Sequence, residues 1–253
     1  MKRRKDNMST TQDNLKLLAI ESSGNVASVA ILEQGKIIAE LTMNNKKTHS
    51  TTLLPMIDQM IKMCEKNLNE FDGIAVTRGP GSFTGLRIGA ATVKGLGLAL
   101  DLPVIPVSTL ECLAMNVVES HDIICPIMDA RRNQVYTAAY EAKDGRLQEV
   151  LKEEPMDIKD LIEKLNVFDK KVLFLGDGVA VYQGVIEEEL KEKACFAKEH
   201  NMVQRASSLA VLAKDKWEDR VTSKEFHLEY LRASQAEREW KEEHQGEELP
   251  CLS

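Results

Sequence analysis

The sequence lacks the cysteine patterns that mark a disulfide framework or a zinc site. Its five cysteines are scattered, and no two of them form a C-x-x-C pair: Cys64, Cys112, Cys125, Cys195 and Cys251. An odd and irregular set of this kind is typical of reduced thiols in the cytoplasm. We therefore expect a cytoplasmic protein whose cysteines are mostly buried.

An excess of positive charge and long apolar runs are also missing. The chain has 33 Lys and Arg against 40 Asp and Glu, a formal charge of −7, which argues against holding nucleic acid on a broad basic face. We expect contact with RNA only through a partner. No run of 18 apolar residues predicts a membrane span. Polar residues follow the basic Met1–Lys5, so no signal peptide is expected.

The common catalytic and phosphate-binding motifs are absent as well. No Lys-Ser or Lys-Thr follows the glycines of residues 79–89, and their spacing misses G-x-G-x-x-G by one residue. No G-x-S-x-G occurs, and no cysteine has a catalytic signature. His49 would need a second histidine four residues later to form a metal pair on a helix, but that residue is Leu53. We expect neither catalytic residues nor a metal site.

What the chain does have is a glycine-rich turn between an apolar strand and a long helix. The strand Ile74–Val76 ends in Gly79-Pro80-Gly81, and the helix that follows to Leu100 contains four glycines, at positions 85, 89, 95 and 97. Interior glycines cost a helix about 0.8–1 kcal/mol each relative to alanine, so close packing must offset roughly 3–4 kcal/mol. A glycine turn before a helix is also a candidate anion site. We favour a turn that serves close packing, and binding of an anion at this turn remains the alternative.

The apolar pattern predicts the same order of elements twice. The first half comprises an antiparallel meander (Leu17–Ile20, Val26–Leu32, Ile37–Met43), helix Ser50–Asn67, strand Ile74–Val76, the helix to Leu100, strand Val104–Val107 and a helix from the capping box Ser108–Glu111. The second comprises strands Ile123–Met128, Val135–Glu141 and Leu147–Val150, helix Asp157–Leu165, strand Val172–Leu175, helix Tyr182–Lys193, strand Cys195–Ala197 and helix Ala206–Arg220. We predict an α/β fold with duplicated βββαβαβα units. Its parts are a flexible arm (1–14), two lobes (15–120 and 121–221) and a tail (222–253) disordered after about residue 240.

Three segments are candidates for binding. Glu21, Ser22 and Ser23 follow a strand, where they could contact a phosphate or magnesium ion or simply form a polar turn. Asp129–Arg132 could bind a carboxylate or phosphate, although an exposed turn would look the same. The helix Ser50–Asn67 has an apolar face that Met56 and Met63 widen, which suits either a partner surface or the rim of the core.

Several of these segments together resemble the bacterial TsaB (YeaZ) family, over roughly residues 15 to 240. The similar segments are Leu18–Ser23, His49-Ser50 with Leu53–Pro55, Gly79–Gly89, Asp129–Arg132 and Tyr230–Arg232, of which Gly79–Gly89 is the most specific. The resemblance implies a two-lobed fold of the actin, Hsp70 and sugar-kinase (ASKHA) type. It also implies a role in making N6-threonylcarbamoyladenosine, the modified base beside the anticodon of tRNAs that read codons beginning with adenine.

By this resemblance the chain is a non-catalytic paralogue of TsaD, the threonylcarbamoyl-transferring subunit. It is expected to pair with TsaD, or with itself when alone, and to be joined by TsaE; the complex uses ATP and magnesium, but this chain binds no cofactor tightly. The implied interface residues lie on two helices: Ser50, Met56, Met60, Met63, Thr84, Gly85, Arg87, Ile88, Gly89 and Thr92. The alternative, contact with an anion or a nucleotide, would involve Glu21, Ser22, Ser23, Gly79, Gly81 and Ser82.

Two departures from the family and two rival functions accompany this expectation. Glu21 stands where the family more often has Asp, which makes nucleotide binding there more doubtful, and the N-terminal arm is the other departure. The first rival is an ATP-dependent phosphotransferase using Glu21, Ser22 and the turns around Gly79 and Gly176. The second is a metallopeptidase, against which Leu53 argues.

Overall fold

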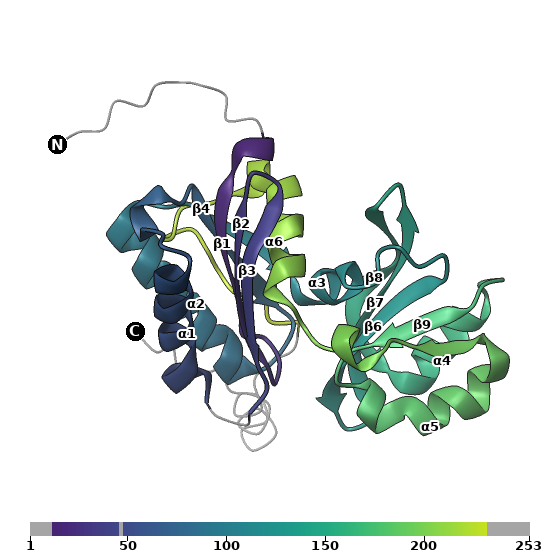
Figure 1. Cartoon of the computed structure of the whole chain (residues 1–253). Helices are drawn as coiled ribbons and strands as arrows, with labels where there is room; N and C mark the ends of the chain where they lie inside the picture. The colour runs from purple at the N-terminus through teal and green to yellow at the C-terminus, as the bar shows by residue number, and fades with distance from the viewer. Residues whose placement is uncertain (1–11, 46–47, 232–253) are drawn as a thin grey trace, which may run out of the picture.

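The computed structural model describes residues 12–45 and 48–231, which form two α/β halves with the same order of elements (Figure 1). The first half contains β1 (Lys16–Glu21), β2 (Ala27–Glu33), β3 (Lys36–Met43), α1 (His49–Met63), β4 (Gly73–Gly79), α2 (Phe83–Leu100), β5 (Val104–Ser108) and α3 (Thr109–Met115). The second contains β6 (Ile123–Arg131), β7 (Gln134–Lys143), β8 (Arg146–Asp157), α4 (Ile158–Asn166), β9 (Val172–Leu175), α5 (Val179–Leu190), β10 (Ala194–Phe196) and α6 (Ala206–Asp215).

Each half is built on one five-stranded sheet, and the two sheets have equivalent strand orders. They are β3-β2-β1-β4-β5 and, in the second half, β8-β7-β6-β9-β10. The first three strands of each unit pair antiparallel, and the last two join in parallel. The predicted meander and the α/β fold with duplicated βββαβαβα units are confirmed. Because β1, β4 and β5 run parallel, their carboxyl ends meet at one edge of the first sheet.

The last helix of each unit packs with the sheet of the other unit. In α3, Leu110 and Leu113 are buried with Ile124 and Met128 of β6. In α6, Ala206 to Ala213 are buried with residues of β1 and β2. The sequence analysis placed Ala206–Arg220 in the second lobe, and its packing corrects that assignment. An apolar helix face does not specify which sheet will cover it. The order of elements alone therefore could not assign α6 to the first or the second sheet.

Polar side chains of the first sheet fix the start of α6. Glu40 of β3 accepts hydrogen bonds from the Ser207 amide (2.9 Å) and hydroxyl (2.7 Å), and Arg205 pairs with it at 2.6 Å. The Ala206 amide donates to the Ser28 hydroxyl at 3.1 Å. Since helix amides at an N-terminus have no partners within the helix, these contacts both cap α6 and attach it to the first sheet.

Helix α1 differs at both ends from its predicted range Ser50–Asn67. It begins at His49 after the N-cap Thr48, and it ends at Met63. Glu65 adopts a left-handed conformation (φ 51°), and the Lys66 amide bonds back to the Ile61 carbonyl at 3.0 Å, a Schellman motif. Asn67 then caps a separate short 3₁₀ turn. Local capping chemistry therefore ended the helix four residues earlier than the apolar pattern suggested.

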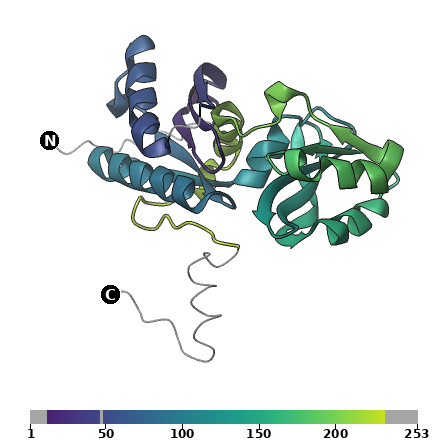
Figure 2. The ribbon, with the colours of Figure 1, turned by 90° about the horizontal axis from the view of Figure 1, so that it is seen from below.

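The described part of the C-terminal tail packs on the first half. Val221 pairs with Val104 in an isolated antiparallel bridge, and Phe226, 1% exposed, lies in the core between the sheet, α1 and α2. Figure 2 shows this yellow-green segment running beside α2. The expectations for the arm before Gln12 and for the tail beyond Leu231 fall outside the described residues. None of the helices within residues 12–45 and 48–231 is long and apolar enough to cross a membrane.

Candidate functional site

The glycine turn after β4 packs tightly against the chain itself. A Cβ atom on Gly81 would lie 2.3 Å from the Ser23 carbonyl oxygen, and one on Gly79 would lie 2.4 Å from the Glu229 carbonyl oxygen. The Ser82 amide donates to the Ser23 carbonyl at 2.7 Å, which holds the turn against the end of β1. The turn therefore needs glycine because backbone from elsewhere in the chain occupies the side-chain positions.

The inner face of α2 continues this contact. Cβ atoms on Gly85 and Gly89 would lie 2.1 Å from the Ser22 carbonyl oxygen and 2.4 Å from the Ser22 hydroxyl, respectively. That hydroxyl donates to the Gly85 carbonyl at 2.9 Å. Two of the four glycines of α2 thus leave room for Ser22. This close packing within the chain offsets the free energy that these two glycines cost the helix. The geometry favours packing over an anion cradle at the predicted contact residues Ser22, Ser23 and Gly81.

Glu21 is a fully buried carboxylate at the end of β1. Its Oε1 accepts hydrogen bonds from the Ser23 amide and hydroxyl, while Oε2 has no partner among the described residues. Burial raises the pKa of Glu21 above its ordinary value, although the hydrogen bonds from Ser23 oppose the shift. The hydroxyl of Thr77 also acts on this carboxyl and opposes the rise in its pKa. A desolvated acid of this kind is poorly suited to bind a phosphate.

The position on α1 where a metal-binding pair would need its second histidine lies in the core. Leu53 is 1% exposed and belongs to the core cluster of the first half. His49 directs Nε2 at the Gly24 carbonyl (2.9 Å), beside the turn that follows β1. In the part of the chain that the structure describes, no group of three His, Cys, Asp or Glu residues could hold a metal ion.

Side chains bridge the two halves next to Glu21. Gln204, 3% exposed, lies so close to Gly24 that a Cβ there would be 2.5 Å from its Oε1, and its amide nitrogen is 3.7 Å from the Met128 sulfur of β6. A second bridge joins the Ser108 hydroxyl to Glu153 of β8. These contacts fill the region where the two sheets approach each other with the chain's own polar groups.

The outer face of α2 presents small and apolar groups to solvent. Its exposed positions are Thr84, Arg87, Ala91, Gly95, Leu98 and Ala99, spaced three or four residues apart as on one side of a helix, with Leu98 and Ala99 adjacent at its end. Leu98 is 68% exposed, and no atom lies within 4 Å of a Cβ built on Gly95. On α1, Leu54 and Met63 are 54% and 71% exposed. Leu54 and Met63 are nine residues apart and so lie on opposite sides of α1. The exposed positions of α2 alone form the docking face discussed below.

The structure divides the predicted interface residues into two groups. Ser50, Met63, Thr84 and Arg87 are exposed, and Ile88 and Thr92 are half-buried. Met56, Met60, Gly85 and Gly89 are buried in the first half, so their assignment to a partner surface is wrong. The reason is that the inner faces of both helices meet the sheet and Ser22. Sequence reasoning left Leu98 out, although its three-residue spacing from Gly95 was the signal that could have found it.

An aromatic stack that the sequence analysis missed borders the docking face. The rings of Phe83 and Tyr230 stack with centroids 4.3 Å apart, and the Arg87 guanidinium carbon lies 5.1 Å and 5.9 Å from these two centroids. The Arg87 Nε donates to the Tyr230 hydroxyl at 3.3 Å. Glu229 anchors the same segment through an ion pair with Arg78 (2.8 Å). The C-terminal segment therefore positions a surface arginine of α2.

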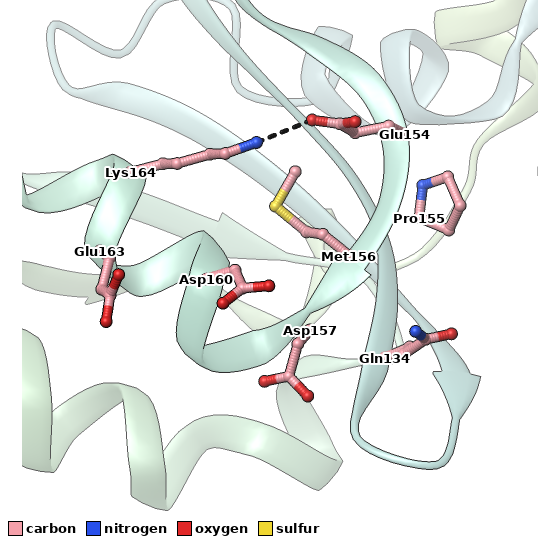
Figure 3. Close-up of a pocket in the computed structure, with 8 residues that line it drawn as sticks. All are labelled: Gln134, Glu154, Pro155, Met156, Asp157, Asp160, Glu163 and Lys164. Carbon is pink, nitrogen blue, oxygen red and sulfur yellow. Dashed lines mark hydrogen bonds and ion pairs between the residues drawn. The ribbon is translucent and has the colours of Figure 1, made fainter.

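The second half carries two further polar features. The candidate segment Asp129–Arg132 is the end of β6 and the first residue of the turn to β7, where the Arg131 amide donates to Asp129 at 2.8 Å. An open pocket of about 540 Å³ lies between β8 and α4 (Figure 3), where Lys164 pairs with Glu154 at 2.9 Å. Half of its lining residues are acidic: Gln134, Glu154, Pro155, Met156, Asp157, Asp160, Glu163 and Lys164. Neither feature brings together groups for catalysis.

Comparison with known proteins gives a consistent set of similarities. The family model described as "TsaD: tRNA N6-adenosine threonylcarbamoyltransferase" matches residues 36–240. The tRNA threonylcarbamoyladenosine biosynthesis protein TsaB of Bacillus subtilis is 37% identical over 231 residues, covering 89% of this chain and 98% of that protein. TsaB of Haemophilus influenzae is 35% identical over 189 residues, covering 70% and 78% of the two chains.

A solved structure from Pseudomonas aeruginosa, described as similar to peptidase YeaZ, shares the fold. It superposes with a TM-score of 0.76 at 27% identity, covering 86% of this chain and all of that one. The sequence match to TsaB spans nearly the whole length of the B. subtilis protein, and the duplicated fold agrees with it. The chain therefore belongs to the TsaB family of tRNA threonylcarbamoyladenosine biosynthesis proteins.

Proposed function

We propose that this chain is a non-catalytic subunit that binds a TsaD-type protein through the docking face and thereby supports formation of N6-threonylcarbamoyladenosine. In this proposal TsaE joins the pair, ATP and magnesium serve the complex, and tRNA is reached only through the complex in the cytoplasm. The observation that carries the proposal is the outer face of α2, where Ala91, Gly95 and Leu98 remain exposed.

The glycines of α2 support this assignment by their division between two faces. Gly85 and Gly89 leave room for Ser22 and Gly97 leaves room for Ser223, whereas a Cβ on Gly95 would meet no atom within 4 Å. An exposed glycine in a helix interior costs about 0.8–1 kcal/mol relative to alanine, and close approach of another backbone would offset that cost. Exposed apolar side chains gathered on one face are typical of a surface that another protein covers.

The geometry around Glu21 supports a non-catalytic role. A phosphotransferase would need an accessible carboxylate and free backbone amides at the glycine turn. Glu21 is fully buried, and the Ser82 amide is bonded to Ser23. Gln204 and Gly24 occupy the junction of the two halves. The rival phosphotransferase predicts micromolar ATP binding and turnover by the isolated chain, which calorimetry with ATP and magnesium would detect.

Co-elution with a TsaD protein tests the docking face. Gly95→Arg and Leu98→Glu place bulk and charge on exposed positions and should abolish co-elution while leaving the fold intact. Gly89→Arg is unsuitable, because Gly89 contacts Ser22 inside the protein. Val181→Glu on α5, where Val181 is 58% exposed, is the matched control and should bind normally. Undiminished binding by both α2 variants would refute the interface.

A reconstituted reaction tests the role itself. tRNA, ATP, threonine, bicarbonate and the partner proteins should give the modified base only when this chain is present. The docking variants should lower product formation in proportion to lost binding. Product formation at the same rate without this chain would refute the proposal.

A further inference from the structure

The chain crosses between its two halves twice. It leaves the first half through residues 116–122, which follow α3, and it returns through residues 197–205 to α6. Helix α3 lies between the halves (Figure 1), where Cys112 is buried in the apolar cluster of α6 and Leu110 in that of β6. A change in the angle between the halves would therefore have to rotate the backbone of these two crossings.

Asn116, the C-cap of α3, joins the two crossings. Its side-chain amide donates to the carbonyl of Asn201 at 3.0 Å and to that of Val203 at 2.8 Å, both on the return crossing. Its Oδ1 accepts a hydrogen bond from the Ser208 hydroxyl of α6 at 2.7 Å. Both amide hydrogens and the oxygen of this side chain are therefore used, and each bond goes to a different residue of the returning chain.

The return crossing is attached to the second half, to α3 and to the region between the sheets. The Met202 carbonyl accepts the Gly176 amide of the second half at 3.0 Å. The Arg205 carbonyl accepts a hydrogen bond from the Cys112 sulfur of α3 at 3.4 Å, and Gln204 is only 3% exposed. Because a hinge has to change φ and ψ, rotation in this segment would break these contacts together with the bonds of Asn116.

We propose that Asn116 is a clamp that holds the two halves at one angle, so that the chain behaves as a single rigid body. A ligand changes the arrangement of a protein only by favouring a state that the protein can reach, and the clamp leaves one such state. A partner that contacts both halves then loses little affinity to the ordering of this subunit. The inference goes beyond the proposed docking, because it concerns the angle between the halves with or without a partner.

A distance measured between the halves tests the clamp. Spin labels carried by non-canonical amino acids at Met63 and Val167, which are 71% and 79% exposed, suit pulsed electron paramagnetic resonance. The wild type should give one narrow distance that ATP and magnesium leave unchanged. Asn116→Asp places a carboxylate oxygen against both carbonyls and should broaden the distribution about twofold or more. Asn69→Ala, at an exposed asparagine of the first half, is the matched control and should keep the wild-type distance.

Amide hydrogen exchange distinguishes a loosened hinge from a weakened fold. The Ala206 and Ser207 amides, which begin α6, bond to side chains of the first sheet. In Asn116→Asp their exchange should accelerate about tenfold more than that of amides in β4, because two hydrogen bonds beside them are lost. Ser208→Ala removes one bond of the clamp and leaves the two carbonyl contacts, so it should give a smaller acceleration at the same amides.

Two results would overturn the inference. One is a wild type with two distances, or with a distance that ATP and magnesium change. The other is a folded Asn116→Asp protein whose distance and exchange equal those of Asn69→Ala. If Asn116→Asp does not melt cooperatively, Ser208→Ala decides, and wild-type exchange at Ala206 then refutes the clamp. Neither measurement uses a TsaD-type partner, so failure of the docking proposal leaves this test unaffected.

Discussion

Each half of the molecule has a glycine turn after its fourth strand, and the two turns are built alike. In the first half Gly81 lies against the Ser23 carbonyl; in the second, a Cβ on Gly176 would lie 2.2 Å from the Ile127 carbonyl oxygen. Both turns therefore press on the strand that begins their own unit, or on the residues just after it. The duplication has kept this internal contact, which marks it as part of the fold.

The helices that follow these turns differ on the side that faces solvent. The exposed side of α5 carries Gln183, Glu187, Glu188 and Glu189 around Val181, whereas α2 shows Ala91, Gly95 and Leu98. Glutamates keep a surface hydrated, and small apolar groups favour contact with another protein. The two halves share the glycine turn that packs on the first strand of its own unit. They differ in the helix after the turn, whose exposed side is acidic in α5 and small and apolar in α2.

The largest effect should come from filling the inner contact. Gly85→Ala places a methyl group 2.1 Å from the Ser22 carbonyl oxygen, so the helix or strand must move. We expect a loss of about 3 kcal/mol or more, the upper range for overpacking. Thermal melting measures it. Gly95→Ala on the outer face, where nothing lies within 4 Å, should instead gain about 0.8–1 kcal/mol. Equal melting temperatures for the two variants would contradict the division of faces.

Removing the carboxylate that holds α6 should have the next largest effect. Glu40→Ala leaves the Ser207 amide and hydroxyl and Arg205 without their acceptor. Arg205 is partly solvent-exposed, so we expect a loss of about 2 kcal/mol, within the range for charged hydrogen bonds. Denaturant titration measures it. Ser223→Ala, in the C-terminal segment, is a control expected within about 0.5 kcal/mol of wild type.

The same carboxylate should make stability depend on acid pH. Burial alone would raise the pKa of Glu40, but hydrogen bonds from Arg205 and Ser207 outweigh it and lower the pKa. Its contribution is complete above the unfolded value of about 4.3 and is lost as the pH falls through the lower folded value. Glu40→Ala should therefore remove part of the decline in stability below pH 4. An unchanged acid profile would show that α6 is held otherwise.

The sequence predicted the order of strands and helices along the chain in both units, because each meander is local and its turns are marked by glycine and polar residues. It could not place α6, whose apolar residues fit either sheet, nor assign Met56, Met60, Gly85 and Gly89 to the inside. At the candidate site it placed Gly85 and Gly89 on a partner surface, whereas both face Ser22 inside the chain. Which side of α2 meets Ser22 depends on contacts between residues more than sixty positions apart, and helical periodicity does not report them.

A smaller effect is expected from neutralising Glu21. Burial raises the pKa of this carboxyl, so its contribution is favourable below the unfolded value and is lost as the pH rises through the folded value. Glu21→Gln keeps an acceptor for Ser23 and removes the buried charge. Its stability relative to wild type should improve from pH 4.5 to pH 7, as urea titrations at the two pH values would show. A relative loss toward pH 7 would mean that the charged form is the stable one.

The smallest effect concerns the one α5 glycine that resembles Gly95. Gly184 is exposed, and nothing lies within 4 Å of its Cβ position. Gly184→Ala and Gly95→Ala should thus raise stability equally, by about 0.8–1 kcal/mol or a few degrees in melting temperature. They should differ in binding to the TsaD-type partner. In the proposed complex a methyl group on Gly95 would hold the partner away from the α2 backbone, whereas a methyl group on Gly184 of α5 meets only water. If only Gly95→Ala binds the TsaD-type partner more weakly, the outer face of α2 is what distinguishes the two halves in function. If both variants bind equally well, Gly95 is not part of the docking face.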